Sequence, residues 1–413
     1  MEASKRKTNT NTQSSIDEII NKIKKSINYC YNCNRCTNVC PLSHLGIFSP
    51  RNLINDLSFL SIQEAMERNN IWLCLSCGQC NTYCPMTNEK EGVNIPQLIL
   101  DLRIITKEEA IEQEKVAQCE THDGIFSTIA RLQADNPLPP NKLDFLNDSN
   151  LKISQSGSIA YFVGCLPILE HTLYRLNINY VNSAKTIIGL LNEGGIKPVV
   201  LNEKCCGHDI LWGKADEITF KKLAEYNVEL YRKAGVKTII FGCAEGYRTW
   251  KYDYPKYIED FEFEIVHFSE FLLENQILDN MRFPQSEEVT VTYHDPCRLG
   301  RLGGGLYDAP RKLIELLPEV KLIEMKNIRE DALCCGVSAF SGCNEYTRVL
   351  RKNRIQEAID TGAEYMLVSC PKCLSHFECY LQEPSLNHNQ KERKNKIKIM
   401  DLAAFIGKLL YYS

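Results

Sequence analysis

Cysteine is the residue type whose number and spacing in this chain point most directly to chemistry. Twenty cysteines stand among 413 residues, and most of them fall into tight groups. A disulfide scaffold would be a shorter, exported chain, whereas dense cysteine in a reducing cytosol more often binds metal. The sequence therefore predicts a cytoplasmic metal-binding protein.

The first two cysteine groups repeat one pattern: three cysteines two residues apart, a fourth three residues on, and then a proline. They are Cys30, Cys33, Cys36, Cys40 with Pro41, and Cys74, Cys77, Cys80, Cys84 with Pro85. This is the bacterial two-cluster ferredoxin run, in which the fourth cysteine ligates the other cluster. The spacing predicts two [4Fe–4S] clusters that carry electrons, one on Cys30, Cys33, Cys36 and Cys84, the other on Cys74, Cys77, Cys80 and Cys40. A pair of zinc sites is the alternative, which the third cysteine and the proline of each run disfavour.

The later cysteines form an internal repeat. Each copy has a strand-like run ending in a cysteine, then a cysteine pair followed by glycine, then another strand-like run ending in a cysteine. The first copy holds Cys165, Cys205, Cys206 and Cys243; the second holds Cys297, Cys334, Cys335, Cys370 and a fifth cysteine, Cys373. The offset between matching cysteines stays nearly constant, falling from 132 to 129 to 127 residues, so the two copies predict two similar structures.

Helical segments at 173–192, 216–234 and 344–361 separate the strand-like runs. This alternation indicates parallel α/β sheets, which place their sites at the carboxyl ends of strands. The predicted fold class is α+β to α/β: a mostly helical two-cluster ferredoxin-type domain followed by two similar α/β cysteine-rich lobes. The expected parts are a disordered tail at 1–14, the ferredoxin-type domain at 15–118 with helices at 15–28, 51–70 and 95–117, a polar linker at 119–157, the first lobe at 158–285 and the second lobe at 286–413.

The two copies of the repeat differ at the fifth cysteine. Five thiols exceed what a cubane needs, so the second copy predicts an unusual or opened cluster; a disulfide, Cys334–Cys335 or Cys370–Cys373, is the alternative. The first copy has Gly246 where the second has Cys373. It is expected to hold a cubane, an altered cluster or no cluster, and His208, after the cysteine pair, is a candidate replacement ligand.

Several polar residues near the second copy have two readings each. His294 and Asp295 would either supply a proton and tune a cluster or simply form a turn. Three cations would either attract an anion and offset cluster charge or lie solvated on the surface; they are Arg298, Arg301 and Lys372. The cysteines outside the groups, Cys119, Cys343 and Cys379, are expected to be buried thiols.

The paired-cysteine pattern resembles the cysteine-rich domain of heterodisulfide reductase subunits, and CYNCNRCTNVCP with WLCLSCGQCNTYCP resembles the small iron–sulfur subunit of the same enzyme. The resemblance runs from residue 25 to the C-terminus and implies two subunits fused. It implies a noncubane [4Fe–4S] cluster at each paired-cysteine site, where a disulfide is cleaved and iron captures its sulfurs. The catalytic set would be Cys297, Cys334, Cys335, Cys370 and Cys373, with Cys165, Cys205, Cys206 and Cys243 holding a further cluster. Gly246 departs from the pattern, and Arg298 stands where relatives often have histidine.

The same architecture occurs in electron-transfer subunits of glycolate, lactate and glycerol-3-phosphate dehydrogenases, which gives a second function to weigh: relay to a quinone or membrane cytochrome. No flavin or nicotinamide motif is visible, so the expected partners are a flavoprotein or a membrane cytochrome b-type subunit, with a small disulfide or thiol as substrate. A net charge of −4 argues against nucleic acid. With no apolar run of 18 residues and a polar N-terminus, the expected location is the cytoplasm or, through a partner, the membrane face.

Overall fold

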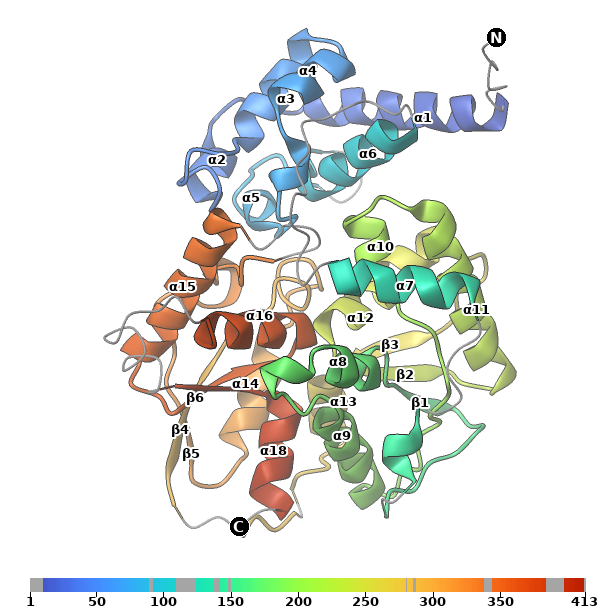
Figure 1. The fold of residues 1–413 in the computed structure, drawn as a ribbon, viewed down its shortest axis with the longest axis vertical. Helices are drawn as coiled ribbons and strands as arrows, with labels where there is room; N and C mark the ends of the chain where they lie inside the picture. The colour runs from blue at the N-terminus through green and yellow to red at the C-terminus, as the bar shows by residue number, and fades with distance from the viewer. Residues whose placement is uncertain are drawn as a thin grey trace. The chain divides into compact units, whose positions relative to one another are not determined.

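The computed structural model describes residues 10–88, 92–108, 124–136, 142–147, 150–279, 281–284, 287–337, 344–383 and 397–411. The chain divides into two compact units, Met1–Gln118 and Cys119–Ser413. The first unit is drawn in blue to cyan in Figure 1, and the second runs from teal to red. No described helix is long and apolar enough to cross a bilayer.

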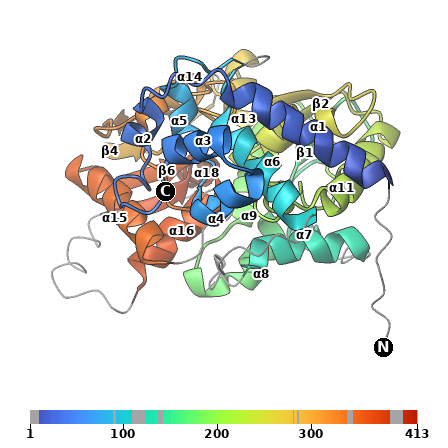
Figure 2. The same cartoon turned by 90° about the horizontal axis from the view of Figure 1, so that it is seen from above.

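Helices are the regular elements of the first unit within its described residues. Its helices are α1 (Thr10–Ile27), α2 (Arg35–Val39), α3 (Pro50–Phe59), α4 (Ile62–Arg68), η1 (Ile71–Leu73), α5 (Gln79–Thr82) and α6 (Ile95–Glu108). Helix α1 packs on α3 and α6, as seen from above in Figure 2. It begins at Thr10, inside the segment 1–14 expected to be disordered.

The helix predicted at 51–70 is two helices. The first ends at Phe59, and Ser61 caps the second, because its side chain accepts from the Glu64 N–H while the Glu64 side chain accepts from the Ser61 backbone N–H. Such a capping box starts a new helix wherever the chain turns. The turn lets α3 and α4 pack on each other between the two cysteine motifs.

The second unit contains two parallel sheets. The first has the order β1-β2-β3 and the second the order β5-β4-β6-β7. The strands are β1 (Ile159–Phe162), β2 (Thr238–Phe241), β3 (Glu264–His267), β4 (Val289–Tyr293), β5 (Val320–Leu322), β6 (Tyr365–Val368) and β7 (Lys398–Asp401). Strands β1, β2, β4 and β6 are the four cysteine-terminated runs, and the predicted fold class is confirmed.

Helices cover both sheets (Figure 1). Those of the first lobe are α8 (Leu166–Thr172), α9 (Val181–Glu193), α10 (His208–Trp212), α11 (Glu217–Lys233), α12 (Ala244–Arg248) and α13 (Phe268–Glu274), and those of the second are α14 (Asp308–Glu315), α15 (Glu345–Asp360), α16 (Pro371–Leu381) and α18 (Leu402–Tyr411). Helices α9 and α18 join the lobes. Their approach is so close that a Cβ on Gly407 would collide with the Thr186 side chain.

The segment 119–157, expected to be a linker, contributes to the first lobe. Within it, helix α7 (Ile125–Asp135) packs on α10 and α11. Its Gln133 side chain accepts from the Cys205 N–H at 2.5 Å. Farther on, the Lys142 ammonium donates to the buried Glu203 carboxylate at 2.9 Å. This segment therefore helps to position the first paired-cysteine site.

Candidate iron–sulfur sites

The eight cysteines of the first unit line two cavities. One is lined by Cys30, Cys33, Cys36 and Cys84. The other is lined by Cys40, Cys74, Cys77 and Cys80. Each cavity thus takes three cysteines from one motif and the fourth from the other. This grouping supports the ligand sets predicted from spacing, and four convergent thiols fit the chemistry of a [4Fe–4S] cluster.

The two motifs bend in the same way around their cavities. The residues on either side of the second cysteine are left-handed in both motifs: Asn32 and Asn34 in the first, Ser76 and Gly78 in the second. This bend brings the Asn32 N–H to 3.3 Å from the Cys30 sulfur and the Ser76 N–H to 3.4 Å from the Cys74 sulfur. Backbone N–H groups aimed at sulfur are among the contacts that tune an iron–sulfur cluster.

Arg103, on α6, is a residue of this unit that sequence reasoning missed. It is fully buried and donates to the carbonyls of Ile71 and Cys74, at 3.1 and 2.8 Å. Burial raises the pKa of the Cys74 thiol to about 12, and the Arg103 charge opposes that rise. Arg103 therefore fixes the start of the second motif and brings a positive charge to its first cysteine. A cation within the apolar run Leu98–Ile105, which is interrupted only by Asp101 and Arg103, was the available signal.

Three further thiols, one lining the first cavity and two lining the second, are hard to ionise by themselves. Burial raises the pKa of Cys36 to about 11 and raises that of Cys40 and Cys80, and neighbouring cysteines add to each rise. Metal ligation requires thiolates. Binding of iron at these cavities would therefore be coupled to release of protons.

The second lobe brings all five of its grouped cysteines together. Cys297 follows β4, Cys370 follows β6 and Cys373 lies in the first turn of α16. The Cys373 thiol lies 3.4 Å from the Cys335 sulfur. Hydrogen bonds from Cys334 and Cys373 lower the pKa of Cys335 to about 6, against the effect of burial. The set is thus compact, buried except for a half-buried Cys297, and contains one thiol that ionises readily.

The glycine after each cysteine pair is required by the backbone. Gly336 has φ +85°, and a Cβ there would lie 2.6 Å from the Thr347 carbonyl oxygen. Gly207 has φ +82° and abuts the Phe220 ring. In both lobes this turn points the glycine N–H at the first sulfur of the pair, at 3.4 Å. The CCG triplet therefore encodes one local geometry that is used twice.

The first lobe gathers four cysteines. Cys165 follows β1, Cys243 follows β2, and the Cys165 and Cys206 thiols donate to the Cys205 sulfur. Those two hydrogen bonds lower the pKa of Cys205 well below its ordinary value. The four thiols can therefore act together on one metal group, and whether they do so stays a prediction.

In the first lobe, which lacks the fifth cysteine, the residue packed behind that position is larger than its counterpart in the second lobe. A Cβ on Gly246 would lie 3.1 Å from the Phe241 ring. Phe241 ends β2 and stacks on Phe162 at 5.0 Å between ring centroids. The matching residue at the end of β6 is the smaller Val368. Aromatic packing thus stands behind position 246, where the second lobe has room for Cys373.

His294 and Asp295 have structural partners. The Arg354 guanidinium donates to His294 Nδ1 at 3.0 Å, and burial together with that charge holds the pKa of His294 well below its usual range. Asp295 accepts a bidentate pair from Arg311, at 2.7 and 2.8 Å. A neutral histidine that accepts from arginine does not supply a proton. These two residues therefore hold the loop in front of Cys297.

Two of the three cations near the second site are buried, so the surface reading is wrong for them. Arg298 is 1% exposed and Lys372 is 4% exposed. Arg301 is half-buried and donates to the carbonyls of Glu330 and Ala332. Lys372 forms ion pairs with Asp209 and, at 3.1 Å, with Glu245, which are both residues of the first lobe.

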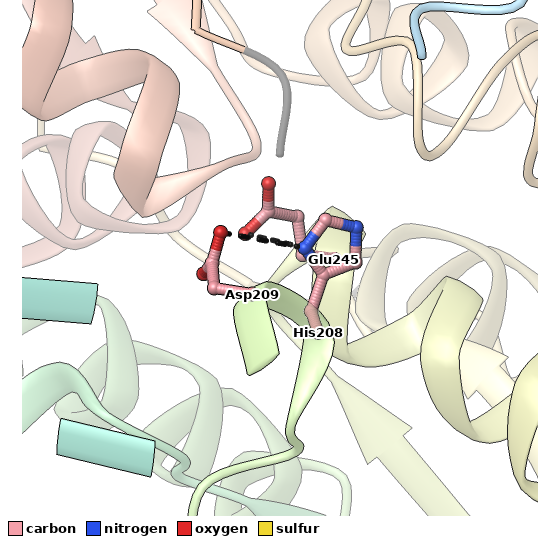
Figure 3. Close-up of side chains that lie close together, drawn as sticks. All are labelled: His208, Asp209 and Glu245. Carbon is pink, nitrogen blue, oxygen red and sulfur yellow. Dashed lines mark ion pairs between the residues drawn. The ribbon is translucent and has the colours of Figure 1, made fainter. Parts of the chain in front are cut away.

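His208 points toward those two carboxylates rather than into the first cysteine site. Its Nδ1 lies 3.7 Å from Asp209 and 3.5 Å from Glu245 (Figure 3), and its Nε2 accepts from Arg298 at 2.9 Å. Burial lowers the pKa of His208, so it is neutral there. With Nε2 engaged in this way, the geometry does not support His208 as a replacement for the missing cysteine ligand.

The remaining cysteine predictions have mixed outcomes. The eighteen cysteines within the described residues are thiols, so neither disulfide considered for the second copy is present. Cys379 is half-buried on α16 rather than buried. Cys119 and Cys343 lie outside the described residues.

Models of known protein families match the ferredoxin-type domain and both cysteine-rich lobes. Residues 26–88 match a 4Fe-4S dicluster domain, and residues 159–247 and 291–378 match a cysteine-rich domain. The chain therefore combines a two-cluster iron–sulfur module with a duplicated cysteine-rich module.

Several known oxidoreductase proteins are similar to this chain in sequence. The chain is 33% identical to a subunit of the dihydromethanophenazine:CoB–CoM heterodisulfide reductase of Methanosarcina mazei, over 58% of the chain and 59% of that protein. It is 29% identical to the corresponding subunit from Methanosarcina barkeri, over 67% of the chain and 66% of that protein. It is also 28% identical to EtfAB:quinone oxidoreductase of Syntrophomonas wolfei, over 48% of the chain and 28% of that protein.

The predicted resemblance is confirmed: the chain is similar to iron–sulfur subunits of heterodisulfide reductases and carries a 4Fe-4S dicluster domain and two cysteine-rich domains. The matched region spans 59% and 66% of the two Methanosarcina proteins. These two relatives are named as subunits of an oxidoreductase. This agrees with the prediction that the chain needs partner subunits.

Proposed function

We propose that electrons pass through two [4Fe–4S] clusters of the first unit to the five-cysteine site of the second lobe, where a disulfide is reduced. The balance is one disulfide, two electrons and two protons giving two thiols, and the reverse reaction oxidises two thiols. The observation that carries the proposal is the convergence of five cysteines, four of them buried and Cys297 half-buried, from the loop after β4, the CCG turn, the end of β6 and α16. Five sulfur ligands exceed the needs of an electron-carrying cubane, so they favour a site with chemistry of its own.

The residues of the second lobe have distinct roles in this proposal. A cluster held by the five cysteines would supply the electrons and an iron site for sulfur. Cys334, Cys335, Cys370 and Cys373 are buried and keep water from that centre, whereas the half-buried Cys297 marks the side that is open to solvent. His294 and Asp295 hold the Cys297 loop in place through Arg354 and Arg311.

The alternative is a relay subunit, which passes electrons between a flavoprotein dehydrogenase and a quinone or membrane cytochrome. Two observations favour it. The first lobe lacks a fifth cysteine at Gly246, and one relative is named a quinone oxidoreductase. In both functions the expected partners are other redox subunits, a flavoprotein or a cytochrome b-type protein, at the cytoplasmic side of a membrane.

Electron paramagnetic resonance on anaerobically purified protein tests the proposal. Oxidation in the presence of a small thiol should produce a paramagnetic signal, and Cys334→Ser should abolish it because one of the five sulfurs is lost. Cys205→Ser should leave that signal, and Cys379→Ser, outside both sites, serves as the matched control. Clusters that exchange electrons with a dehydrogenase but never respond to thiol would favour the relay function instead. Zinc without iron would contradict both functions.

A further inference from the structure

Arg298 lies directly against the second cysteine site. It follows Cys297 in the chain, and its guanidinium donates to the Cys297 sulfur at 3.7 Å. The side chain is 1% exposed, so its charge is not screened by bulk water. A buried cation bonded to one of the five sulfurs is placed to act on whatever metal group those sulfurs hold.

The partners that orient Arg298 come from the other lobe. His208 Nε2 accepts from the Arg298 Nε at 2.9 Å. The guanidinium also lies over the Trp212 ring, 5.3 Å from its centroid. His208 and Trp212 begin and end α10, the short helix that follows the first CCG triplet. The turn that shapes the first cysteine site therefore also presents two side chains to the second.

A second cation contact fixes the same junction between lobes. Lys372 and Glu245 occupy matching places, each two residues after the cysteine that follows its strand, yet they carry opposite charges and pair at 3.1 Å. Beside them the Ala244 N–H donates to the Ser369 carbonyl at 3.1 Å. The lobes are thus joined at the carboxyl ends of β2 and β6, close to both cysteine sites. The ion pair between Lys372 and Asp209 of α10 also holds this helix beside the second lobe, where it contacts Arg298.

The buried charges of this junction are well compensated. Burial would raise the pKa of Asp209, but Lys372 and His208 outweigh it and hold that pKa below its ordinary value. Asp209 therefore stays ionised beside Lys372. Arg298, in contrast, contacts neutral His208 and the Trp212 ring in the first lobe, and these two contacts orient its charge without cancelling it. The guanidinium thus faces the sulfur of Cys297.

We propose that Arg298 is a positioning residue that raises the reduction potential of the second-lobe cluster, and that the first lobe, through His208 and Trp212, holds it in place. This inference rests on the proposed function insofar as it requires a cluster at the five-cysteine site. A hydrogen bond from a cation to a ligand sulfur stabilises the more negative, reduced state of a cluster. The four-cysteine lobe thereby acts as part of the site of its neighbour.

A redox titration of the full-length holoprotein tests this inference, using the paramagnetic signal that Cys334→Ser removes. Arg298→Leu should make reduction about tenfold less favourable, a midpoint shift of about 59 mV to lower potential for one electron. Arg298→Lys, which keeps the charge, should restore most of the potential. His208→Ala, which releases Arg298 without removing it, should shift the potential in the same direction by a smaller amount.

Arg301→Leu is the matched control, because Arg301 lies three residues on and donates to the backbone carbonyls of Glu330 and Ala332. It should leave the potential unchanged. An unchanged potential in Arg298→Leu with full iron content would overturn the inference and leave the proposed function standing, as would an equal shift in Arg301→Leu. Should Arg298→Leu lose the cluster, an unshifted His208→Ala would still overturn it. A wild-type protein with no second-lobe signal would contradict the proposed function as well.

Discussion

The two cysteine-rich lobes share one strand plan but differ in how the loop after the first strand is held. In the first lobe, Glu203 accepts from the Gly164 N–H at 2.7 Å and from Lys142. In the second, Asp295 lies within that loop and pairs with Arg311. Each lobe thus uses a buried ion pair for the same task, taken from different parts of the chain. The fold tolerates such exchange, whereas the CCG turn is the same in both lobes.

The lobes also differ in what stands behind the fifth ligand position. The second lobe has Cys373 with Val368 behind it, and the first has Gly246 with Phe241 behind it. Differences at two positions therefore separate a five-cysteine site from a four-cysteine site, while the sheet is kept in both lobes. Similar folds do not imply similar chemistry, because chemistry depends on a few positions.

The largest expected effect concerns the two buried ion pairs. Arg311→Met should lower the free energy of unfolding by about 3–5 kcal/mol, because it leaves the buried carboxylate of Asp295 without its cation. Lys142→Met should cost only about 1–3 kcal/mol, since Glu203 keeps its bonds from the Gly164 N–H and the Tyr231 hydroxyl. Asp295 keeps the bond from the Arg329 N–H, but Arg311→Met removes the cation of Glu324 as well. Urea unfolding of the anaerobic holoprotein, followed by circular dichroism, measures both losses. An equal or larger loss in Lys142→Met would refute this difference between the lobes.

The next effect is a pH dependence of opposite sign in the two lobes. His267 ends β3 and caps α13, and Asp401 ends β7 and caps α18 through the Ala403 N–H. Burial lowers the pKa of His267 to about 3 and raises that of Asp401 to about 6. The stability from His267 is present above pH 6.5 and is lost as the pH falls toward 3. The stability from protonated Asp401 is present below pH 3.8 and is lost as the pH rises through 6.

Substitution separates these two contributions. Asp401→Asn should stabilise the protein above pH 6 by up to about 3 kcal/mol, and the gain should fade toward pH 4. His267→Gln should instead flatten the loss of stability between pH 6.5 and pH 3. Urea unfolding at a series of pH values measures both, with wild type as the reference. A gain in Asp401→Asn that grows toward acid pH would show that the sign is wrong.

The smallest effect concerns the first-lobe site, which has four cysteines and Gly246 in the fifth position. Gly246→Cys should lower the free energy of unfolding by about 1–2 kcal/mol, because its Cβ crowds a Phe241 ring that is fixed by Phe162 and Trp250. The same substitution should cost less in a Phe241→Val background, where the ring is gone. A double-mutant cycle in urea measures the coupling. Additive losses would mean that Phe241 does not compensate for the missing cysteine.

The sequence was most informative where spacing alone determines geometry. The ferredoxin-type motifs predicted which cysteines share a cavity, and the repeat predicted strands β1, β2, β4 and β6. Short edge strands such as β5 carry too little pattern to be recognised. Helix α7 was missed because it lies directly before a polar, proline-bearing segment, although its apolar residues recur at helical spacing.

The contacts between lobes could not be predicted from the chain. Lys372 and Asp209 are 163 residues apart, and nothing near either residue shows that the other neutralises it. A charge beside a cysteine is usually solvated, so burial of Arg298 and Lys372 becomes apparent only when both sheets are in place. His208 was likewise assigned by its distance from the cysteine pair along the chain, whereas its ring contacts the other lobe.

The packing of α18 on α9 has a consequence for how the molecule is completed during synthesis. Helix α9 belongs to the first lobe, but the helix that covers it near Thr186 is translated after every strand of both sheets. Until α18 has been synthesised, the side of α9 that it covers has no packing partner from this helix. Cys373 also emerges late, shortly before α18. The two lobes can therefore reach their joined form only after α18 has been synthesised.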